Sequence, residues 1–160
     1  ADAGAPMPAG GGVVVAEWDG PSEDGGEGGG CKDSVRVFRL SDADVYPWHA
    51  RFEPMTLFFI DGASPVDTED DKWLLFAVIR TDVSTGAWRL LSFATVYEFF
   101  VYPGSTRARL SQIIVLPPFQ RQGLGGRVLE AVRSHAVSQK WHDITVEDPT
   151  PQLQRLRDAA

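Results

Sequence analysis

An apolar run that ends at two prolines and continues as a glycine-rich loop is the most constraining feature of the chain. Residues 111–126 read SQIIVLPPFQRQGLGG. Proline has no backbone N–H, so Pro117 and Pro118 end the hydrogen-bond ladder of a strand. Apolar side chains then recur at helical spacing as far as about Lys140, which indicates an amphipathic helix. The segment therefore predicts a strand, a loop and a helix in succession.

The glycines of this loop suggest a phosphate site. The first four N–H groups of a helix have no internal partner, and they carry the positive end of the helix dipole. Glycine lets a ligand come close to these groups, and Arg121 and Arg127 would add positive charge. The spacing lacks both G-x-G-x-x-G and a following Gly-Lys-Ser/Thr, so neither the dinucleotide fingerprint nor a P-loop is present. A plain strand-to-helix turn is the alternative interpretation.

The other elements can be predicted from periodicity and turn residues. Strands are expected over 34–40, 72–80, 88–102, 107–116 and 142–147, and helices over 41–60, 124–140 and from 149 onward. Pro54 conflicts with one continuous helix, because a proline in a helix interior removes a hydrogen bond. Three antiparallel strands followed by a β-α-β crossover predict an α/β (α+β) chain with a mixed, mostly antiparallel sheet flanked by helices.

The first part of the chain has a different composition. Residues 1–33 are rich in glycine and hold few large apolar side chains, which predicts a disordered segment. The short stretch VVVAEW at 13–18 is compatible with an edge strand. We therefore expect a folded core over 34–160.

Composition limits the classes of function. The chain has 160 residues, which suits one domain, and a net charge of −7, which argues against nucleic acid as the main ligand. No apolar run is long enough for a transmembrane helix. The single cysteine, Cys31, and the three histidines show no metal-ligand spacing, so no metal is expected.

Several stretches resemble a known family. The loop Gln120-Arg121-Gln122-Gly123-Leu124-Gly125-Gly126 is similar to the Q/R-x-x-G-x-G/A motif of the GNAT acetyltransferases. The stretches TVYEFFVYP, TRARLSQIIVLPPFQRQGLG and DITVEDP, with HARFEPMTLFFIDGASPVDTEDDKW before them, resemble the catalytic subunits of type B histone acetyltransferases. The resemblance covers about 34–160. It implies the GNAT acyl-CoA N-acyltransferase fold and a catalytic core that is truncated at its C-terminus.

The resemblance also implies where acetyl-CoA, the expected cosubstrate, would bind. The pyrophosphate is expected on the glycine loop, and the thioester on backbone groups of the strand before it. Thr150 matches a position that contacts the cofactor in the family, whereas Ala159 stands where the family tends to have an aromatic residue. The expected cofactor-binding residues are Ile113, Ile114, Val115, Gln120, Arg121, Gln122, Gly123, Leu124, Gly125, Gly126 and Thr150.

Catalytic and substrate residues follow from the same resemblance. Glu147 ends a strand near the expected crevice and is the candidate general base, with Asp148 in support. For Asp148, however, the favoured interpretation is the cap of a helix that begins at Pro149. The resemblance places Tyr97, Glu98 and Phe99 along the acceptor channel, although an ordinary strand would have the same residues on alternating faces.

These observations predict a histone lysine N-acetyltransferase of type B, which acetylates newly synthesised soluble histones by direct transfer from acetyl-CoA. The implied partners are histone tails and a β-propeller histone-chaperone subunit, without nucleic acid or membrane, in nucleus and cytoplasm. Two alternatives remain at this point. One is a GNAT enzyme that acts on a small amine or a protein N-terminus, and the other is a CoA- or histone-binding module without turnover.

Overall fold

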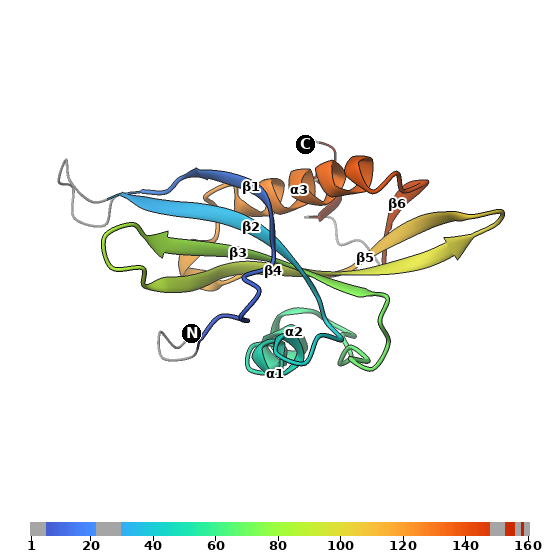
Figure 1. Cartoon of the computed structure of the whole chain (residues 1–160), viewed down its shortest axis with the longest axis horizontal. Helices are drawn as coiled ribbons and strands as arrows, with labels where there is room; N and C mark the ends of the chain where they lie inside the picture. The colour runs from blue at the N-terminus through green and yellow to red at the C-terminus, as the bar shows by residue number, and fades with distance from the viewer. Residues whose placement is uncertain (1–5, 22–29, 148–152, 156–157, 159–160) are drawn as a thin grey trace.

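A computed structural model describes residues 6–21, 30–147, 153–155 and 158. Its centre is one curved sheet whose strand order follows the sequence (Figure 1). The first five strands pair antiparallel and the sixth pairs parallel to the fifth, which confirms the expected mixed sheet. The strands are β1 (Val13–Asp19), β2 (Cys31–Arg39), β3 (Trp73–Asp82), β4 (Trp88–Val101), β5 (Ser105–Val115) and β6 (Asp143–Val146).

Helices cover both faces of the sheet. The long helix α3 (Leu124–Ser138) lies on one face, and the short helices α1 (Val45–His49) and α2 (Pro54–Phe59) lie on the other (Figure 1). A 3-10 turn, η1 (Pro117–Phe119), links β5 to the glycine loop. None of the helices in the described ranges is long and apolar enough to cross a membrane.

The central strand β3 explains why both faces need cover. Leu74, Phe76 and Val78 are buried under α3. Leu75, Ala77 and Ile79 point to the other face and pack with residues of α1. Successive side chains of a strand point to opposite faces, so a continuous apolar run at 74–79 requires a layer on each side. Each layer removes apolar surface from water, at about 25 cal/mol per Å².

The predicted single helix over 41–60 is wrong. The structure has two helices, and Pro54 is the first residue of the second one. At that position the missing N–H costs nothing, because the first N–H groups of a helix are unpaired in any case. The proline that conflicted with one long helix is thus the start signal of α2.

The predicted disorder of 1–33 is also wrong for part of that range. Residues 13–19 form β1, which confirms the edge strand expected at 13–18, and β2 already begins at Cys31. The Arg36 guanidinium donates a hydrogen bond of 2.9 Å to the carbonyl of Gly11 and ties this first segment to the sheet. The composition of this glycine-rich segment does not indicate a strand, and β1 is ordered because its backbone pairs with β2. Within 1–33, residues 1–5 and 22–29 lie outside the described residues.

Candidate active site

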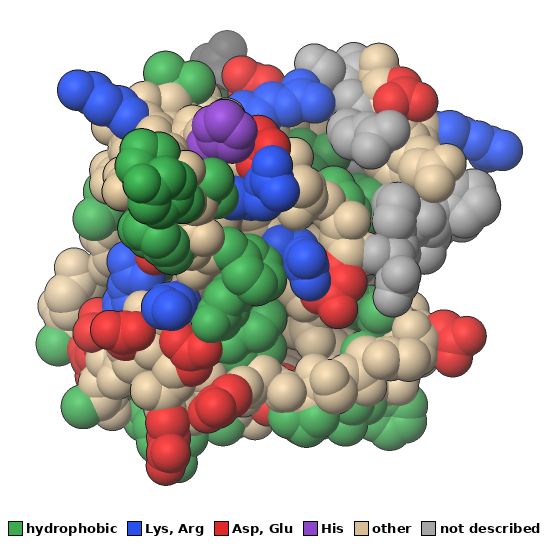
Figure 2. Space-filling model, turned by 90° about the vertical axis from the view of Figure 1, so that its right-hand side faces the viewer, with side chains coloured by type: hydrophobic (Ala, Val, Ile, Leu, Met, Phe, Trp, Pro, Cys, Tyr) green, Lys and Arg blue, Asp and Glu red, His purple; other side chains and the backbone are tan. Residues whose placement is uncertain are grey.

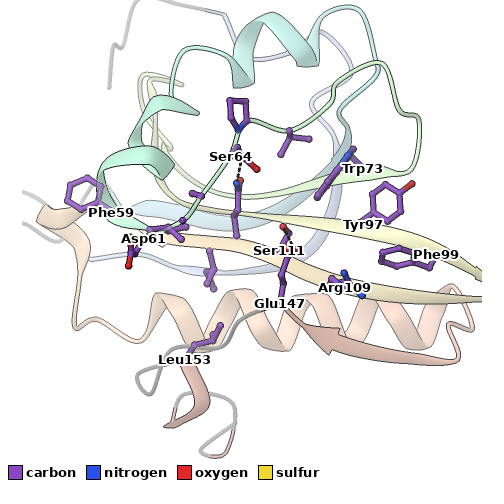
Figure 3. A pocket seen from close by; sticks show the side chains of 17 residues that line it. Phe59, Asp61, Ser64, Trp73, Tyr97, Phe99, Arg109, Ser111, Glu147 and Leu153 are labelled. Atoms are coloured by element: carbon purple, nitrogen blue, oxygen red, sulfur yellow. Dashed lines mark hydrogen bonds between the residues drawn. The ribbon is translucent and has the colours of Figure 1, made fainter.

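A cavity of about 700 Å³ lies between the segment after α2 and the second part of β5 (Figure 3). Residues 60–66, which we call the 60–66 wall, form one side of it. The opposite side comes from the start of β3, from β4 and β5, and from the residue after β6. These lining residues are Trp73, Tyr97, Phe99, Arg109, Ser111, Gln112, Ile113 and Glu147, with Leu153 and Phe59 at the edge.

The cavity exists because β6 leaves β5 halfway along. β6 pairs with Arg107 to Leu110 of β5, and the last bond of this ladder runs from the Glu147 N–H to the Leu110 carbonyl, at 2.9 Å. We call 107–110 the paired half of β5 and 111–115 its open half. The ladder ends at Leu110, so no described strand pairs with 111–115 on the side of β5 away from β4, where the cavity lies.

The open half presents backbone groups toward this gap. The N–H of Leu116 donates to Leu91 of β4, and the carbonyl of Ile114 accepts from Ser92 of β4. Backbone groups of neighbouring residues alternate in direction along a strand, so those of Ile113 and Val115 are directed away from β4. Of the three predicted backbone contacts with the cofactor, the alternation favours Ile113 and Val115 over Ile114.

Glu147 and Ser111 meet at the start of the open half. Thr95 of β4 faces Gln112, and the next residue, Val96, faces Leu110, so Ser111 is one extra residue, a β-bulge. The Ser111 hydroxyl donates a hydrogen bond of 2.7 Å to Oε2 of Glu147. Glu147 is exposed, and its carboxylate lies beside the cavity (Figure 3). A carboxylate in this place can accept a proton from an amine that enters the cavity.

Aromatic rings line the part of the cavity next to Glu147. Tyr97 packs edge-on against Trp73 at 4.9 Å and against Phe99 at 4.6 Å between ring centroids. The guanidinium of Arg109 lies over the Phe99 ring at 4.7 Å. The Tyr97 hydroxyl donates a hydrogen bond of 2.7 Å to Asp70. The structure thus brings Tyr97 and Phe99 together with Glu147, as the sequence predicts.

The hydrogen bond between Tyr97 and Asp70 shifts the acidity of both groups. The phenol hydroxyl, with the backbone N–H of Lys72, lowers the pKa of Asp70 below its ordinary value. The same bond raises the pKa of Tyr97, helped by burial and by the negative charges of Asp70, Asp71 and Asp67. Both shifts keep Tyr97 a neutral donor and Asp70 a charged acceptor at neutral pH.

The glycine loop, residues 120–126, follows the open half of β5 after Leu116 and η1. The Gln120 side-chain amide donates a 3.0 Å bond to the Val115 carbonyl, which fixes the loop to the strand. Gly123 has φ +79 and precedes α3, a left-handed conformation that favours glycine. A side-chain carbon added at Gly123 or Gly126 would meet no heavy atom within 4 Å.

The first turn of α3 fits a phosphate group. It has no side-chain cap and no acidic residue, so its N–H groups and dipole are not compensated there. Arg121 and Arg127 are exposed beside it, and Arg127 lies over the ring of Trp18 at 4.7 Å. Open space over two glycines and uncapped N–H groups are what a pyrophosphate needs. The loop residues therefore fit the predicted cofactor role, although the loop itself does not line the cavity.

Glu98 does not belong to this site. Its side chain lies on the α3 face, where it accepts a 2.6 Å hydrogen bond from Arg39 and borders a separate cavity with His135. Tyr97 and Phe99 point to the opposite face, because side chains alternate along β4. The prediction that all three neighbours line the acceptor channel is wrong for the middle one.

Two predicted residues cannot be placed. Asp148 and Thr150 lie outside the described residues, and so does Ala159. The roles assigned to Asp148 and Thr150 therefore stay predictions. Among the described residues, no group of three or more His, Cys, Asp or Glu side chains is arranged to hold a metal ion.

Sequence reasoning missed several residues of the cavity. Ser111, Gln112, Arg109 and the whole 60–66 wall were not singled out. The pair Ser111–Gln112 carried a usable signal, since two adjacent polar residues interrupt an otherwise apolar strand segment. The wall carried none, because its role arises from contact with residues about fifty positions later.

The end of the molecule that carries β6 and the β4–β5 hairpin has an uneven charge distribution. Figure 2 shows acidic side chains gathered toward the lower left of this face, below a group of hydrophobic side chains. The segment between the 60–66 wall and β3 is strongly acidic. Its Asp67, Glu69 and Asp71 are exposed, and its Asp70 is half-buried.

Comparison with known proteins identifies relatives by sequence. Catalytic subunits of type B histone acetyltransferases are 38% identical over 111 residues in Arabidopsis thaliana, 34% over 155 residues in Mus musculus and 39% over 130 residues in Homo sapiens. These matches cover 68%, 92% and 76% of this chain, but only 24%, 36% and 31% of the relatives. The chain thus spans about a quarter to a third of the length of the curated relatives it matches. No protein-family model matches the chain.

Solved structures show the same fold. A ribosomal-protein-alanine N-acetyltransferase from Brucella melitensis superimposes with a TM-score of 0.56 at 14% identity, covering 79% of this chain and 89% of that one. An aminoglycoside acetyltransferase from an uncultured soil sample gives 0.55 at 16% identity, covering 79% and 84%. The chain therefore has the GNAT acetyltransferase fold and belongs, over the residues matched, to the family of the type B histone acetyltransferase catalytic subunits.

Proposed function

We propose that this chain transfers the acetyl group of acetyl-CoA to lysine side chains of histone tails. The observation that carries the proposal is the carboxylate of Glu147 at a cavity beside the point where the β5–β6 ladder ends. Glycines and uncapped N–H groups at the start of α3 support a pyrophosphate site at the other end of the open half. The names of the relatives supply the substrate class.

The chemistry follows from these groups. Acetyl-CoA supplies a thioester, and the amine nitrogen forms a bond to its carbonyl carbon while the bond to sulfur breaks and CoA leaves as a thiolate. This thiolate takes up the second proton that the nitrogen loses as the amide forms. Glu147 accepts the proton that the lysine ammonium must lose, and its hydrogen bond to Ser111 holds one carboxylate oxygen in place. The outward N–H groups of Ile113 and Val115 are suited to stabilise the carbonyl oxygen as it gains negative charge. The transfer is direct, without an acetylated protein side chain.

The acceptor is a basic peptide in this proposal. The rings of Trp73, Tyr97 and Phe99 give a lysine stem an apolar path toward Glu147. The exposed acidic residues that follow the 60–66 wall favour a positively charged tail. We further propose newly made, soluble histones as substrates, a β-propeller histone chaperone as partner, and action in cytoplasm and nucleus.

Mass spectrometry of the acceptor tests the proposal. The protein is incubated with acetyl-CoA and, separately, a basic histone-tail peptide, a polyamine and a peptide whose only free amine is its N-terminus. Acetylation of a tail lysine, lost in Glu147→Gln, supports both the reaction and its base. Acetylation of only the polyamine or the N-terminus indicates another GNAT activity. Binding of CoA and peptide without any product indicates a binding module.

A further inference from the structure

Gln112 occupies an unusual position in the cavity, next to the bulge. In a regular strand Ser111 and Gln112 would point to opposite faces. Because Ser111 is the extra residue of the bulge, both side chains line the same cavity. One of them contacts Glu147, and the other turns to the opposite side of the cavity.

The Gln112 amide joins β4, β5 and the 60–66 wall. Its Nε2 donates a 2.9 Å bond to the carbonyl of Ser64, and its Oε1 accepts a 3.2 Å bond from the hydroxyl of Thr95. The bond to Ser64 is the dashed line in Figure 3. A carbonyl can only accept, so the amide nitrogen must face Ser64 and the oxygen must face Thr95. The orientation of the side chain is therefore determined by its partners.

The strand end of this link is buried. Gln112 is 6% exposed and Thr95 is fully buried, whereas Ser64 at the wall end is exposed. A buried hydrogen-bonding group that loses its partner leaves an unsatisfied polar atom, which is costly. The 60–66 wall has one further tie from a side chain, since the Val66 N–H donates a 3.0 Å bond to Glu53. The Ser64 and Val66 ties hold the wall at a defined distance from the open half of β5.

We propose that Gln112 is a positioning residue that sets the width of the acceptor side of the cavity. It does not contact the reacting atoms. It holds the 60–66 wall across from Ser111 and Glu147, so that the acceptor amine is confined near the carboxylate. This inference rests on the proposed function, because it assumes that the cavity takes the acceptor peptide.

The glycine loop should not depend on this link. Residues 120–126 are fixed to β5 through Gln120 and Val115, and they do not line the cavity. Loss of the Gln112 amide is therefore expected to weaken acceptor binding while CoA binding stays unchanged. A general loss of packing would instead weaken both.

The test uses a pair of substitutions chosen to keep the core intact. Gln112→Met has a similar length but cannot bond to Ser64, and it leaves the Thr95 hydroxyl without its partner. The double variant with Thr95→Val removes that hydroxyl too, and replacing both partners by apolar groups can be nearly neutral for stability. Thr95→Val alone is the control, because it leaves the bond between Gln112 and Ser64 in place.

The readout is the Kd of a basic histone-tail peptide for the CoA-loaded protein, with the Kd of CoA measured in parallel. We expect the double variant to have a melting temperature close to that of the wild type. It should bind the peptide about tenfold more weakly, because the 60–66 wall loses its hydrogen bond to Gln112. Its CoA affinity should match the wild type, and Thr95→Val should bind the peptide nearly normally. Peptide affinity within twofold of wild type in the double variant would overturn the inference.

The failure of this inference can be told apart from failure of the proposed function. Wild-type protein that binds the peptide but transfers no acetyl group refutes the transfer and leaves the Kd comparison valid. Wild-type protein that binds no peptide at all refutes both. Equal weakening of peptide and CoA binding in the double variant shows a structural role only, and it also overturns the inference.

Discussion

The two halves of β5 belong to one strand but have different surroundings. The paired half, 107–110, has β4 on one side and β6 on the other, and its exposed Arg107 is bound through two hydrogen bonds to Asp143. The open half, 111–115, pairs with β4 alone among the described strands, begins with a bulge, and carries the hydroxyl that holds Glu147. The difference shows how a sheet can provide a site: one strand ends early, and the backbone groups of its neighbour become available to a ligand.

The largest expected effect comes from comparing two carboxylates of the segment 143–147, Asp143 and Glu147. The Asp143 side chain bonds to Arg107 of the paired half, and the Glu147 side chain bonds to Ser111 of the open half. Glu147→Gln should lower kcat for acetyl transfer by about 100-fold or more, the usual size of a general-base effect. Asp143→Asn should leave kcat within about twofold and lower the free energy of unfolding only slightly, as expected for an exposed ion pair. Steady-state kinetics with a tail peptide measures both, and equal losses of kcat would break the comparison.

A glycine in the first turn of α3 gives the next largest effect. Gly126→Glu should weaken CoA binding by about tenfold or more, because a carboxylate would enter open space beside the pyrophosphate. The same substitution should stabilise the helix by about 0.3–1 kcal/mol, since a negative charge near a helix N-terminus is favourable. Calorimetric titration and thermal unfolding would record the two opposite changes.

Gly126→Ala is the matched control for that substitution. It adds a methyl group where no heavy atom lies within 4 Å, and it improves helix propensity by about 1 kcal/mol. CoA affinity that falls as much in the alanine variant as in the glutamate variant would show that space, not charge, is limiting. Unchanged affinity in both would remove the loop from the cofactor site.

Much of the fold could be predicted from local signals. The end of β5 and the start of α3 are marked by Pro117, Pro118 and Gly123. These signals are local and do not depend on contacts with distant residues. Pro54 carried an equally local signal, but the polar and apolar pattern around it suggested a continuous helix. The strand β1 could be predicted only as a possibility, because its stability depends on pairing with β2.

The site was less predictable, for a physical reason. The role of Glu147 could be predicted because the residue lies at the end of a strand. The side of the sheet to which Glu98 points depends on the register of β4, which the sequence alone does not show. The bulge at Ser111 arises from the pairing of β4 with β5, and no local pattern sets it. The contact between Gln112 and Ser64 joins residues 48 positions apart. Single-sequence patterns report local preferences, and these features are tertiary.

Removal of single hydroxyl groups sharpens the comparison further. Ser111→Ala should lower kcat about fivefold to tenfold, because Glu147 loses the bond that orients it, while the Kd of CoA stays the same. Thr145→Val removes a hydroxyl of β6 that donates a 3.3 Å bond to the Ala108 carbonyl in the paired half. This control should retain its kcat. A fall in kcat of similar size in both variants would mean that the hydroxyl of Ser111 has no special role.

The smallest expected effect is on the pH dependence of stability, and it comes from the pair of Arg107 and Asp143. The hydrogen bond and charge of Arg107 lower the pKa of Asp143 below its ordinary value of 3.8. A lowered folded-state pKa gives stability that is present above the ordinary value and is lost as the pH falls through the folded-state pKa. Between about pH 5 and pH 2, Arg107→Gln should therefore lose slightly less stability than the wild type. Denaturant titrations at several pH values would show it, and parallel curves would contradict the assignment.

A structure of the protein with bound acetyl-CoA tests the central claim most directly. The account predicts that the pyrophosphate lies at Gly123 and Gly126, and that the thioester carbonyl faces the backbone N–H of Ile113 or Val115, inside the cavity that Glu147 borders. A thioester outside this cavity, or phosphates away from the start of α3, would contradict the claim that the open half of β5 is the catalytic edge.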